Sequence, residues 1–297
     1  MRSVMVIGAS GYLGSEVLKA LQRMDLNLYA VKNNSSITVQ KGVEVIEGGL
    51  KSLSVETIAR INPEIIFHCG RPTYSRLKRI GRRLAARKAG KLNKKLISNI
   101  KKSKIKTKLV FASGSLVYGN SDKHHNEGSA PNPISYSKQY FKGELPILNE
   151  KGNKNFKVLT LRLPWLLGKG SWFDWFYLKN ISETGRIPLF GDGNNQMSIL
   201  NISDSAELMV EYGMSNADTG VYNIFSPSTP TQLEFAELVS RVFNCTIVPY
   251  AELYPKLEKA ALEAFTSNIL LDSRYMGILG EYQFLGVEES VQDLKSL

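Results

Sequence analysis

Several residues and patterns that mark particular protein classes are scarce or missing in this chain of 297 residues. It has two cysteines, Cys69 and Cys245, far apart and without the spacing of a metal site, so we expect free thiols in a reducing compartment. It has three histidines, and the adjacent pair His124 and His125 lies in a polar stretch that predicts solvated side chains. We therefore expect no bound metal.

Long apolar runs are also missing. No stretch approaches the ~18 apolar residues of a membrane-spanning helix, so we expect no membrane partner. A strand-like run begins by Val4, so we expect no secretory signal. With 43% hydrophobic and 22% charged residues, the composition is typical of a soluble globular protein, and we expect a cytoplasmic one.

Residues 65–121 contain no Asp or Glu, and the excess positive charge of the chain lies within this segment. Sixteen Lys and Arg lie within residues 71–108, and removing them from the net charge of +11 leaves −5 for the rest. Residues 76–102 predict one long helix inside this block. Its expected apolar stripe consists of Ile80, Leu84, Leu92, Leu96 and Ile100.

Three interpretations of the basic block stay open: a solvated helix face, a surface that attracts an anionic substrate or partner, and a nucleic-acid surface. Tyr74 is its one aromatic residue, which is little for stacking bases.

Glycines follow the first apolar run at regular spacing. Gly8, Gly11 and Gly14 come directly after residues 4–7, and residues 15–21 predict a helix. In such a turn the first glycine reverses the chain, the second lets the backbone approach a diphosphate, and the third allows close packing of helix and strand. The helix N-terminus then attracts the phosphates. The alternative is an ordinary strand–helix turn. The predicted cofactor residues of this loop are Gly8, Ser10, Gly11, Tyr12, Leu13 and Gly14.

Strand-like and helical segments alternate through residues 1–163. Strands are predicted at 28–31, 43–46, 65–68, 108–112 and 158–161, and helices at 12–22, 55–61, 76–102 and 136–149. The alternation predicts an α/β fold with a doubly wound parallel sheet of Rossmann type.

Residues 164–297 predict mainly a smaller substrate-binding lobe, with segments near 200–225 returning to the Rossmann domain. An aromatic cluster between Trp165 and Tyr177, a turn at 191–193 and a helix near 232–243 fall in this part.

The order of these motifs resembles the extended short-chain dehydrogenases/reductases, in their nucleotide-sugar epimerase/dehydratase branch. The resemblance is carried by the motifs at residues 8–14, 65–68, 111–119, 127–136, 161–164, 191–193, 201–204 and 271–274. It implies an NAD(P)-dependent enzyme that reduces, epimerises or dehydrates a sugar, in particular a nucleotide sugar.

The resemblance implies that Tyr136 transfers a proton and that a lysine four residues later assists it. That position is Tyr140 here, while Lys138 and Lys142 would point to other sides of a regular helix. A tyrosine phenol, with a reference pKa of ~10, is a poor base at pH 7 but can act as an acid. We therefore expect reduction, in particular of a 4-keto group, to suffer less than oxidation.

The family's Ser or Thr partner of that tyrosine falls at Gly114 in this chain. Ser113 and Ser115 flank it, and either hydroxyl is a candidate catalytic group. The alternative is a strand end built from small residues.

The second strand of NAD-binding members of this family usually ends in an acidic residue, and Lys32 and Asn33 stand there in this chain. A cation suits a 2′-phosphate, so NADP is expected and NAD is the alternative. A plain surface lysine is also compatible with this position. The resemblance adds Cys69, Gly70 and Pro164 to the cofactor-binding residues.

For the substrate, family members often have an arginine where this chain has Met197. Arg71 and Tyr74 follow the strand at 65–68 and are candidate phosphate contacts, together with Trp165 on the lobe. We expect Asp204 to cap a helix at 204–212 rather than to do chemistry.

Like charges across a two-fold axis disfavour a dimer built on residues 76–102, so we expect a monomer or a dimer through another surface. The alternative function is a catalytically impaired protein of this fold. It would sense NADP, or bind RNA or an acidic partner through residues 71–108.

Overall fold

The computed structural model describes residues 1–33, 35–72 and 78–296, which divide into two compact units. Unit 1 contains residues 1–113, 139–162 and 206–222, and unit 2 contains residues 114–138, 163–205 and 223–297. Among the described residues, every helix is too short or too polar to cross a bilayer.

A seven-stranded sheet forms the centre of unit 1, in the order β3-β2-β1-β4-β5-β6-β10. Its strands are β1 (Arg2–Ile7), β2 (Leu26–Val31), β3 (Glu44–Ile46), β4 (Ile65–His68), β5 (Thr107–Gly114), β6 (Phe156–Leu163) and β10 (Gly220–Asn223). β1 pairs in parallel with β2 and β4, β2 with β3, and β4 with β5. The winding reverses at β1, which is the Rossmann arrangement and confirms the predicted fold class.

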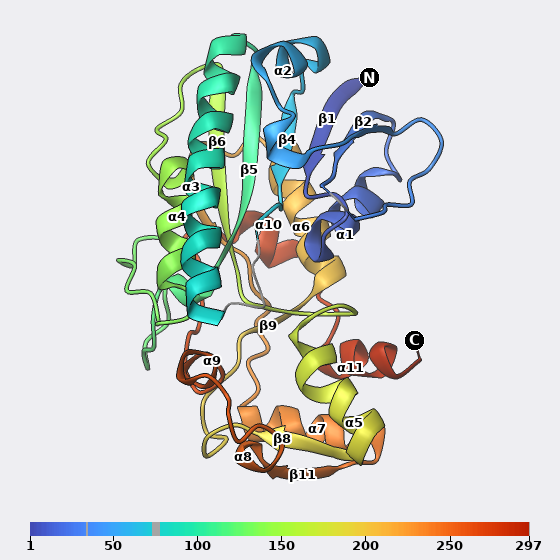
Figure 1. Ribbon diagram of the computed structural model, residues 1–297, viewed down its shortest axis with the longest axis vertical. Helices are drawn as coiled ribbons and strands as arrows, with labels where there is room; N and C mark the ends of the chain where they lie inside the picture. Colours follow the sequence, from blue (N-terminus) through green and yellow to red (C-terminus); the bar gives the residue numbers. More distant parts are fainter. Residues whose placement is uncertain (34, 73–77, 297) are drawn as a thin grey trace. The chain divides into compact units, whose positions relative to one another are not determined.

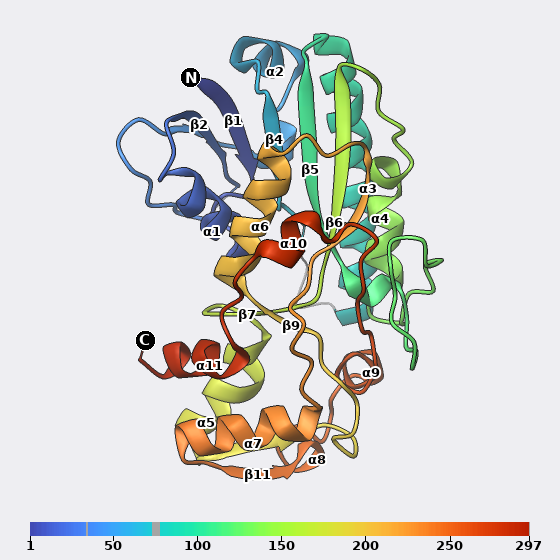
Figure 2. The same ribbon diagram turned by 180° about the vertical axis from the view of Figure 1, so that it is seen from behind.

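Helices cover both faces of this sheet, as parallel strands buried on two faces require. The helices that pack on unit 1 are α1 (Tyr12–Leu21), α2 (Val55–Ile61), α3 (Lys78–Ser103), α4 (Lys138–Leu148) and α6 (Ile202–Met214), with the short η1 (Gly49–Lys51). Figure 1 shows α3 and α4 on one side of the strands, and Figure 2 shows α6 on the other. Met5 and Ile7 share a core with Leu96 of α3, whereas Phe67 lies against Gly213 of α6.

The apolar stripe expected on α3 is only half correct. Leu96 and Ile100 are 1% exposed, but Ile80 is 65% exposed and Leu84 41%. The buried apolar residues in that half of the helix are instead small: Ala85, Ala86 and Ala89. Arg82 is buried there as well, at 8% exposed. The reason is a close approach of α4, since a Cβ on Gly143 would lie 2.8 Å from the carbonyl oxygen of Ala86. Leucine side chains have no room at this crossing.

Unit 2 is built from two small parallel pairs of strands with helices around them. β7 (Trp165–Leu167) pairs with β9 (Ile199–Asn201), and β8 (Arg186–Leu189) pairs with β11 (Thr246–Pro249). The helices are η3 (Ser115–Val117), the π-helical η4 (Asp174–Leu178), α5 (Lys179–Thr184), α7 (Gln232–Phe243), α8 (Tyr250–Leu253), α9 (Lys259–Phe265), α10 (Met276–Glu281) and α11 (Val287–Ser296).

The core of unit 2 is strongly aromatic. Phe173, Tyr177 and Phe235 are fully buried, and the rings of Phe190 and Phe265 stack with centroids 4.1 Å apart. The aromatic cluster seen in the sequence therefore mainly fills this core, with Trp175 as its exposed member (69%).

Candidate functional site

The glycine loop of unit 1 connects the carboxyl end of β1 to α1. Gly8 has a φ of +81°, and a Cβ there would lie 2.6 Å from Cα of Gly70. A Cβ on Gly14 would lie 2.1 Å from the carbonyl oxygen of Gly8. Gly11 is the N-cap of α1 and makes no side-chain cap bond. The loop is thus a cradle of backbone at a helix N-terminus that side chains would fill, and it fits the pyrophosphate of a dinucleotide.

The other predicted residues of the loop lie in and after this turn. Ser10 and Tyr12 are half-buried and Leu13 is buried. Cys69 follows β4, and its N–H donates to the carbonyl oxygen of Ile7 (2.9 Å). Burial raises the pKa of the Cys69 thiol to about 12, so it stays protonated and is no nucleophile. Pro164 is buried in unit 2, between β6 and β7.

Lys32 lies at the carboxyl end of β2, beside a residue that we did not predict. Its ammonium is 2.9 Å from the carboxylate of Glu47, whose side chain is 77% exposed. The hydrogen bond and charge of Lys32 lower the pKa of Glu47. The N–H of Gly49 donates to the carbonyl oxygen of Lys32 (2.8 Å), and Asn33 lies against Gly49. The cation expected for a 2′-phosphate is therefore itself mostly buried, with 15% of its side chain exposed, and it is paired with an exposed carboxylate that a ligand can replace.

Ser113 belongs to a buried polar cluster with Glu144 of α4 and Arg162 of β6. Its hydroxyl donates to Oε2 of Glu144 (2.5 Å) and accepts from Nη1 of Arg162. Nη1 of Arg162 also lies 3.3 Å from Oε2 of Glu144. Burial raises the pKa of Glu144, while the charge of Arg162 and the hydrogen bond from Ser113 oppose it. The hydroxyl of Ser113 is thus engaged in joining β5, α4 and β6.

Ser115 and Tyr136 both belong to unit 2. Ser115 is the first residue of η3 and is 3% exposed, and among the described residues its hydroxyl makes no hydrogen bond. The hydroxyl of Ser137 donates to the carbonyl oxygen of Leu116 (2.7 Å). This bond fastens the turn that carries Tyr136 next to η3. Tyr136 itself packs, half-buried, on the cluster around Tyr118.

α4 begins at Lys138, two residues later than predicted. The cause is a turn in which the N–H groups of Ser137 and Lys138 both donate to the carbonyl oxygen of Ile134. Lys138 and Lys142 are exposed.

Tyr140, at the position where the resemblance implies a lysine, is covered by a cation from another element. The guanidinium of Arg71 lies 4.2 Å from the centre of the Tyr140 ring, which is cation–π geometry. The charge of Arg71 also acts to lower the pKa of Glu144, against the effect of burial. The ring of Tyr140 therefore holds the positive charge of Arg71 at this face of α4.

The predicted substrate residues have varied surroundings. Met197 is 2% exposed and packs in the core of unit 2. Trp165 is half-buried, with its ring stacked on Phe265 at 5.0 Å. Arg71 is exposed, and Tyr74 lies outside the described residues. In this conformation the side chain of Met197 packs among apolar groups rather than at an open surface.

The motif residue Glu127 holds unit 2 together. Its carboxylate accepts hydrogen bonds from the N–H groups of Asn223 (3.1 Å) and Arg274 (2.8 Å) and from the hydroxyl of Ser273 (2.5 Å). The hydroxyl of Tyr118 donates to the side chain of Asn223 (2.7 Å). These motifs therefore join distant loops of the unit.

The prediction that Asp204 caps a helix was wrong. α6 begins earlier, at Ile202, and Oδ1 of Asn201 accepts from the N–H of Ser203 (2.7 Å) as the cap. The carboxylate of Asp204 instead accepts from the hydroxyl of Tyr282 (3.1 Å) and the N–H of Leu285 (2.9 Å). It fixes the segment before α11.

Sequence reasoning missed Glu47, Glu144 and Arg162. A signal existed for Arg162, because it interrupts the apolar run of β6 and a charge in a buried strand needs a partner. Glu47 lies on an exposed strand end and gave no such signal.

Comparison with known proteins places these features in context. A family model described as the NAD dependent epimerase/dehydratase family matches residues 4–224. A search of curated proteins finds no significant match.

Solved structures share the fold over essentially the whole chain. UDP-glucose 4-epimerase from Thermotoga maritima, solved with UDP-glucose, is 20% identical, with a TM-score of 0.78 over 97% of this chain and 96% of that one. UDP-N-acetylglucosamine 4-epimerase from Methanobrevibacter ruminantium, in complex with UDP-N-acetylmuramic acid, is 18% identical, with a TM-score of 0.80 over 100% and 99%. A human epimerase family protein with NADPH is 16% identical, with a TM-score of 0.76 over 100% and 99%. At these identities the likeness establishes the fold.

Proposed function

Because the chain belongs to the NAD dependent epimerase/dehydratase family, we propose that it is a nicotinamide-dependent enzyme acting on a nucleotide sugar. The observation that carries the proposal is the cradle formed by Gly8, Gly11 and Gly14. A Cβ on Gly8 or Gly14 would collide with backbone, and one on Gly11 would lie 3.1 Å from the carbonyl oxygen of Gly8. The substrate class is supported by the UDP-sugars bound to two proteins of the same fold.

The proposed cofactor is NADP, held by residues 8–14 with Gly70, Lys32 and Asn33. In its reduced form, NADPH, it would supply the hydride for reduction of a ketone. Lys32 supports NADP over NAD because it is a cation at the end of β2, and its pairing with the exposed carboxylate of Glu47 leaves it exchangeable.

Reduction of a 4-keto sugar is the reaction that the chain's own groups support best. Tyr136 would donate its phenolic proton to the ketone oxygen, and Ser115 would orient that oxygen with its unengaged hydroxyl. Ser113 is excluded from this role because its hydroxyl already serves Glu144 and Arg162. Reduction needs an acid, and a tyrosine without a lysine beside it can still act as one.

A thermal-shift titration tests the substrate class. With NADPH present, a panel of UDP- and dTDP-sugars should raise the unfolding temperature further only for sugars that the site accepts. NADPH consumption with the matching 4-keto sugar should then be measurable. If no nucleotide sugar adds to the effect of the cofactor, the proposed substrate class is refuted.

A second candidate is a cofactor-binding protein of this fold that has lost turnover. It is favoured by Gly114 and Tyr140, which replace two groups that the family uses. It predicts cofactor binding without turnover of any sugar, and RNA binding in a gel-shift series that weakens steeply with salt.

A further inference from the structure

A cavity of about 790 Å³ lies in unit 1, at the amino ends of the strands. Its lining includes Arg2 at the start of β1, Ile65 at the start of β4 and Thr107 at the start of β5, and it continues to the end of α6. The glycine loop lies at the opposite, carboxyl ends of these strands. The volume is in the range of small-molecule sites.

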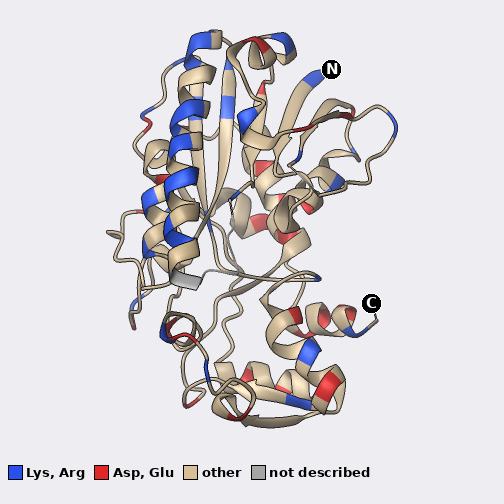
Figure 3. Ribbon diagram, viewed as in Figure 1, with Lys and Arg blue, Asp and Glu red and all other residues tan. Residues whose placement is uncertain are grey.

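The lining of the cavity is strongly basic. Against one carboxylate, Glu64, it contains six cations: Arg2, Lys104, Lys106, Lys108, Lys154 and Lys157. Figure 3 shows further Lys and Arg along α3, whose carboxyl end leads into this region. Asp218 lies outside the lining and pairs with Lys157, but six cations against two carboxylates still leave the cavity positive.

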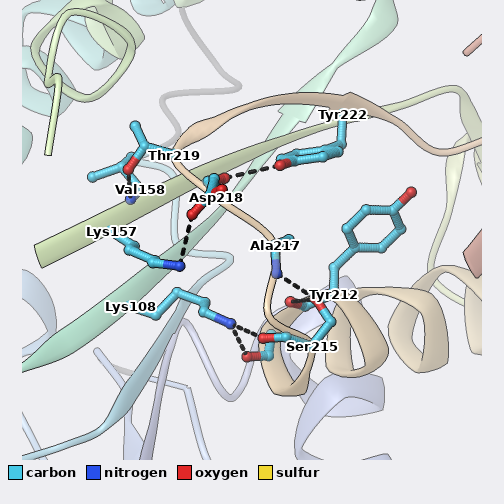
Figure 4. Close-up of polar contacts among 10 residues, drawn as sticks. Lys108, Lys157, Val158, Tyr212, Ser215, Ala217, Asp218, Thr219 and Tyr222 are labelled. Carbon is cyan, nitrogen blue, oxygen red and sulfur yellow. Dashed lines mark hydrogen bonds and ion pairs between the residues drawn. The ribbon is translucent and has the colours of Figure 1, made fainter. Parts of the chain in front are cut away.

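Half of these cations are held in place by the protein. Nζ of Lys108 donates to the carbonyl oxygens of Gly213 (2.8 Å) and Ser215, and Lys157 pairs with Asp218 at 2.8 Å (Figure 4). Arg2 lies 3.7 Å from Glu64. Burial lowers the pKa of Lys108, and the positive charges of Lys157 and Arg2 lower it further. Lys157 and Arg2 therefore both repel the ammonium of Lys108, and a bound anion would relieve that repulsion.

The other half carry unneutralised charge. Lys104, Lys106 and Lys154 are exposed, and within the described parts of the chain their ammonium groups make no ion pair or hydrogen bond. Thr107 adds an independent observation. It is 5% exposed, lines the cavity, and its hydroxyl has no partner among the described residues. A buried hydroxyl in this state stays unsatisfied unless a polar group comes within hydrogen-bond distance of it.

We propose that this cavity is an anion site for a compact ligand that carries two or more phosphoryl groups. Several cations that line one hollow suit the dense charge of a polyphosphate chain. No aromatic side chain is among the described residues of the lining, so no platform for stacked bases is present. Side chains of Asn62, Asn155 and Asn216 supply further donors at the rim. The ligand is either an inorganic polyphosphate or the polyphosphate end of a nucleotide.

Calorimetric titration with tripolyphosphate at fixed ionic strength tests this proposal. The variant that combines Lys104→Gln, Lys106→Gln and Lys154→Gln should bind at least about 10-fold more weakly than the wild type. The matched control combines Lys91→Gln, Lys94→Gln and Lys95→Gln, which removes the same charge from the exposed face of α3. It should change Kd by less than about 2-fold. All six lysines are exposed, so both variants should fold normally.

Two further titrations test where tripolyphosphate binds and whether the ligand is an inorganic polyphosphate or a nucleotide. Gly14→Ala, which disrupts the glycine loop, should still bind tripolyphosphate with the wild-type Kd. Adenosine triphosphate should bind equally well if only the phosphoryl chain is recognised, and more tightly if the nucleoside is also contacted.

Three results would overturn the proposal. The first is wild-type affinity in the cavity variant. The second is equal weakening in the cavity variant and the α3 control, which would indicate unspecific attraction. The third is a single-stranded oligonucleotide that binds more than about 10-fold tighter than tripolyphosphate and competes with it, which would indicate a nucleic-acid surface instead.

Discussion

Two serines only two positions apart have different surroundings, and this difference makes a prediction about single residues. Ser115→Ala should lower kcat for ketone reduction by about 100-fold with little loss of stability, because it removes a donor that no other group uses. Ser113→Ala should instead lower the free energy of unfolding by about 1–3 kcal/mol, because it leaves Glu144 and Arg162 with unfilled hydrogen bonds. Steady-state kinetics and urea unfolding on both variants measure this difference.

The roles assigned to the two serines would be contradicted if their effects on kcat and on stability were exchanged. A large loss of kcat in a stable Ser113→Ala protein, with Ser115→Ala active, would show that Ser113 leaves its cluster during the reaction.

Glu47 should tune the choice of cofactor. Removing its negative charge with Glu47→Gln frees Lys32 for a 2′-phosphate, so the ratio of affinities should move about 10-fold toward NADP. Lys32→Gln should move the same ratio the other way. Titration with NADP and NAD measures both, and an unchanged ratio in the two variants would show that this pair does not contact the cofactor.

At the scale of secondary-structure elements, a buried polar chain joins β4, α3 and α4. Nε2 of His68 lies 3.0 Å from Oδ1 of Asn93, and Nδ2 of Asn93 donates to the carbonyl oxygen of Gly143 (2.9 Å). Since Oδ1 must accept, Nε2 of His68 carries the proton. Nδ1 is buried and has no partner among the described residues, so a second proton there is unfavourable.

The buried hydrogen bonds from His68 through Asn93 to Gly143 predict that the protein loses stability in acid. Burial lowers the pKa of His68 to about 4, whereas an unfolded histidine titrates near ~6.5. His68 therefore leaves the free energy of unfolding at its full value above pH ~6.5. As the pH falls from ~6.5 toward 4, the free energy of unfolding decreases by up to about 3 kcal/mol. His68→Gln should flatten the dependence of unfolding free energy on pH over this range. Equal slopes for wild type and His68→Gln would refute the assignment.

The amino end of α4 offers a gain-of-function test. Tyr140→Lys restores the lysine that the resemblance implies at this position, and its ammonium should help the phenol of Tyr136 to lose its proton. We expect the rate of sugar oxidation at pH 7 to rise at least about 10-fold and its pH optimum to fall. Tyr140→Met removes the ring without adding charge and should give no increase. An equal rise in the oxidation rate of Tyr140→Lys and Tyr140→Met would mean that the ring of Tyr140, and not the missing lysine, limits the rate.

The helices and strands also show where sequence reasoning succeeds. α2, β4 and α7 begin and end where the pattern predicts, because caps at Ser54 and Thr231 and short apolar runs mark their limits locally. The buried face of α3 could not be found this way, since it depends on contact with Gly143, about fifty positions away in the chain.

At the scale of the whole molecule, the fold was predictable and the site only in part. The glycine loop and the alternation of strands and helices determine the Rossmann sheet, because each depends on neighbours in sequence. The partners of Ser113 and Lys32 come from other elements, so only the three-dimensional structure shows that one serine is engaged and that one lysine is paired.

The central claim is that unit 1 binds a nicotinamide dinucleotide in the glycine cradle, and calorimetry with NADP and NAD tests it most directly. Wild type and the control Gly277→Ala, whose added methyl group meets nothing within 4 Å, should bind at least one of the two. Gly14→Ala, whose methyl group would lie 2.1 Å from the carbonyl oxygen of Gly8, should bind at least about 100-fold more weakly. No heat from wild type with either dinucleotide at millimolar concentration, or equal binding by Gly14→Ala, would contradict the account.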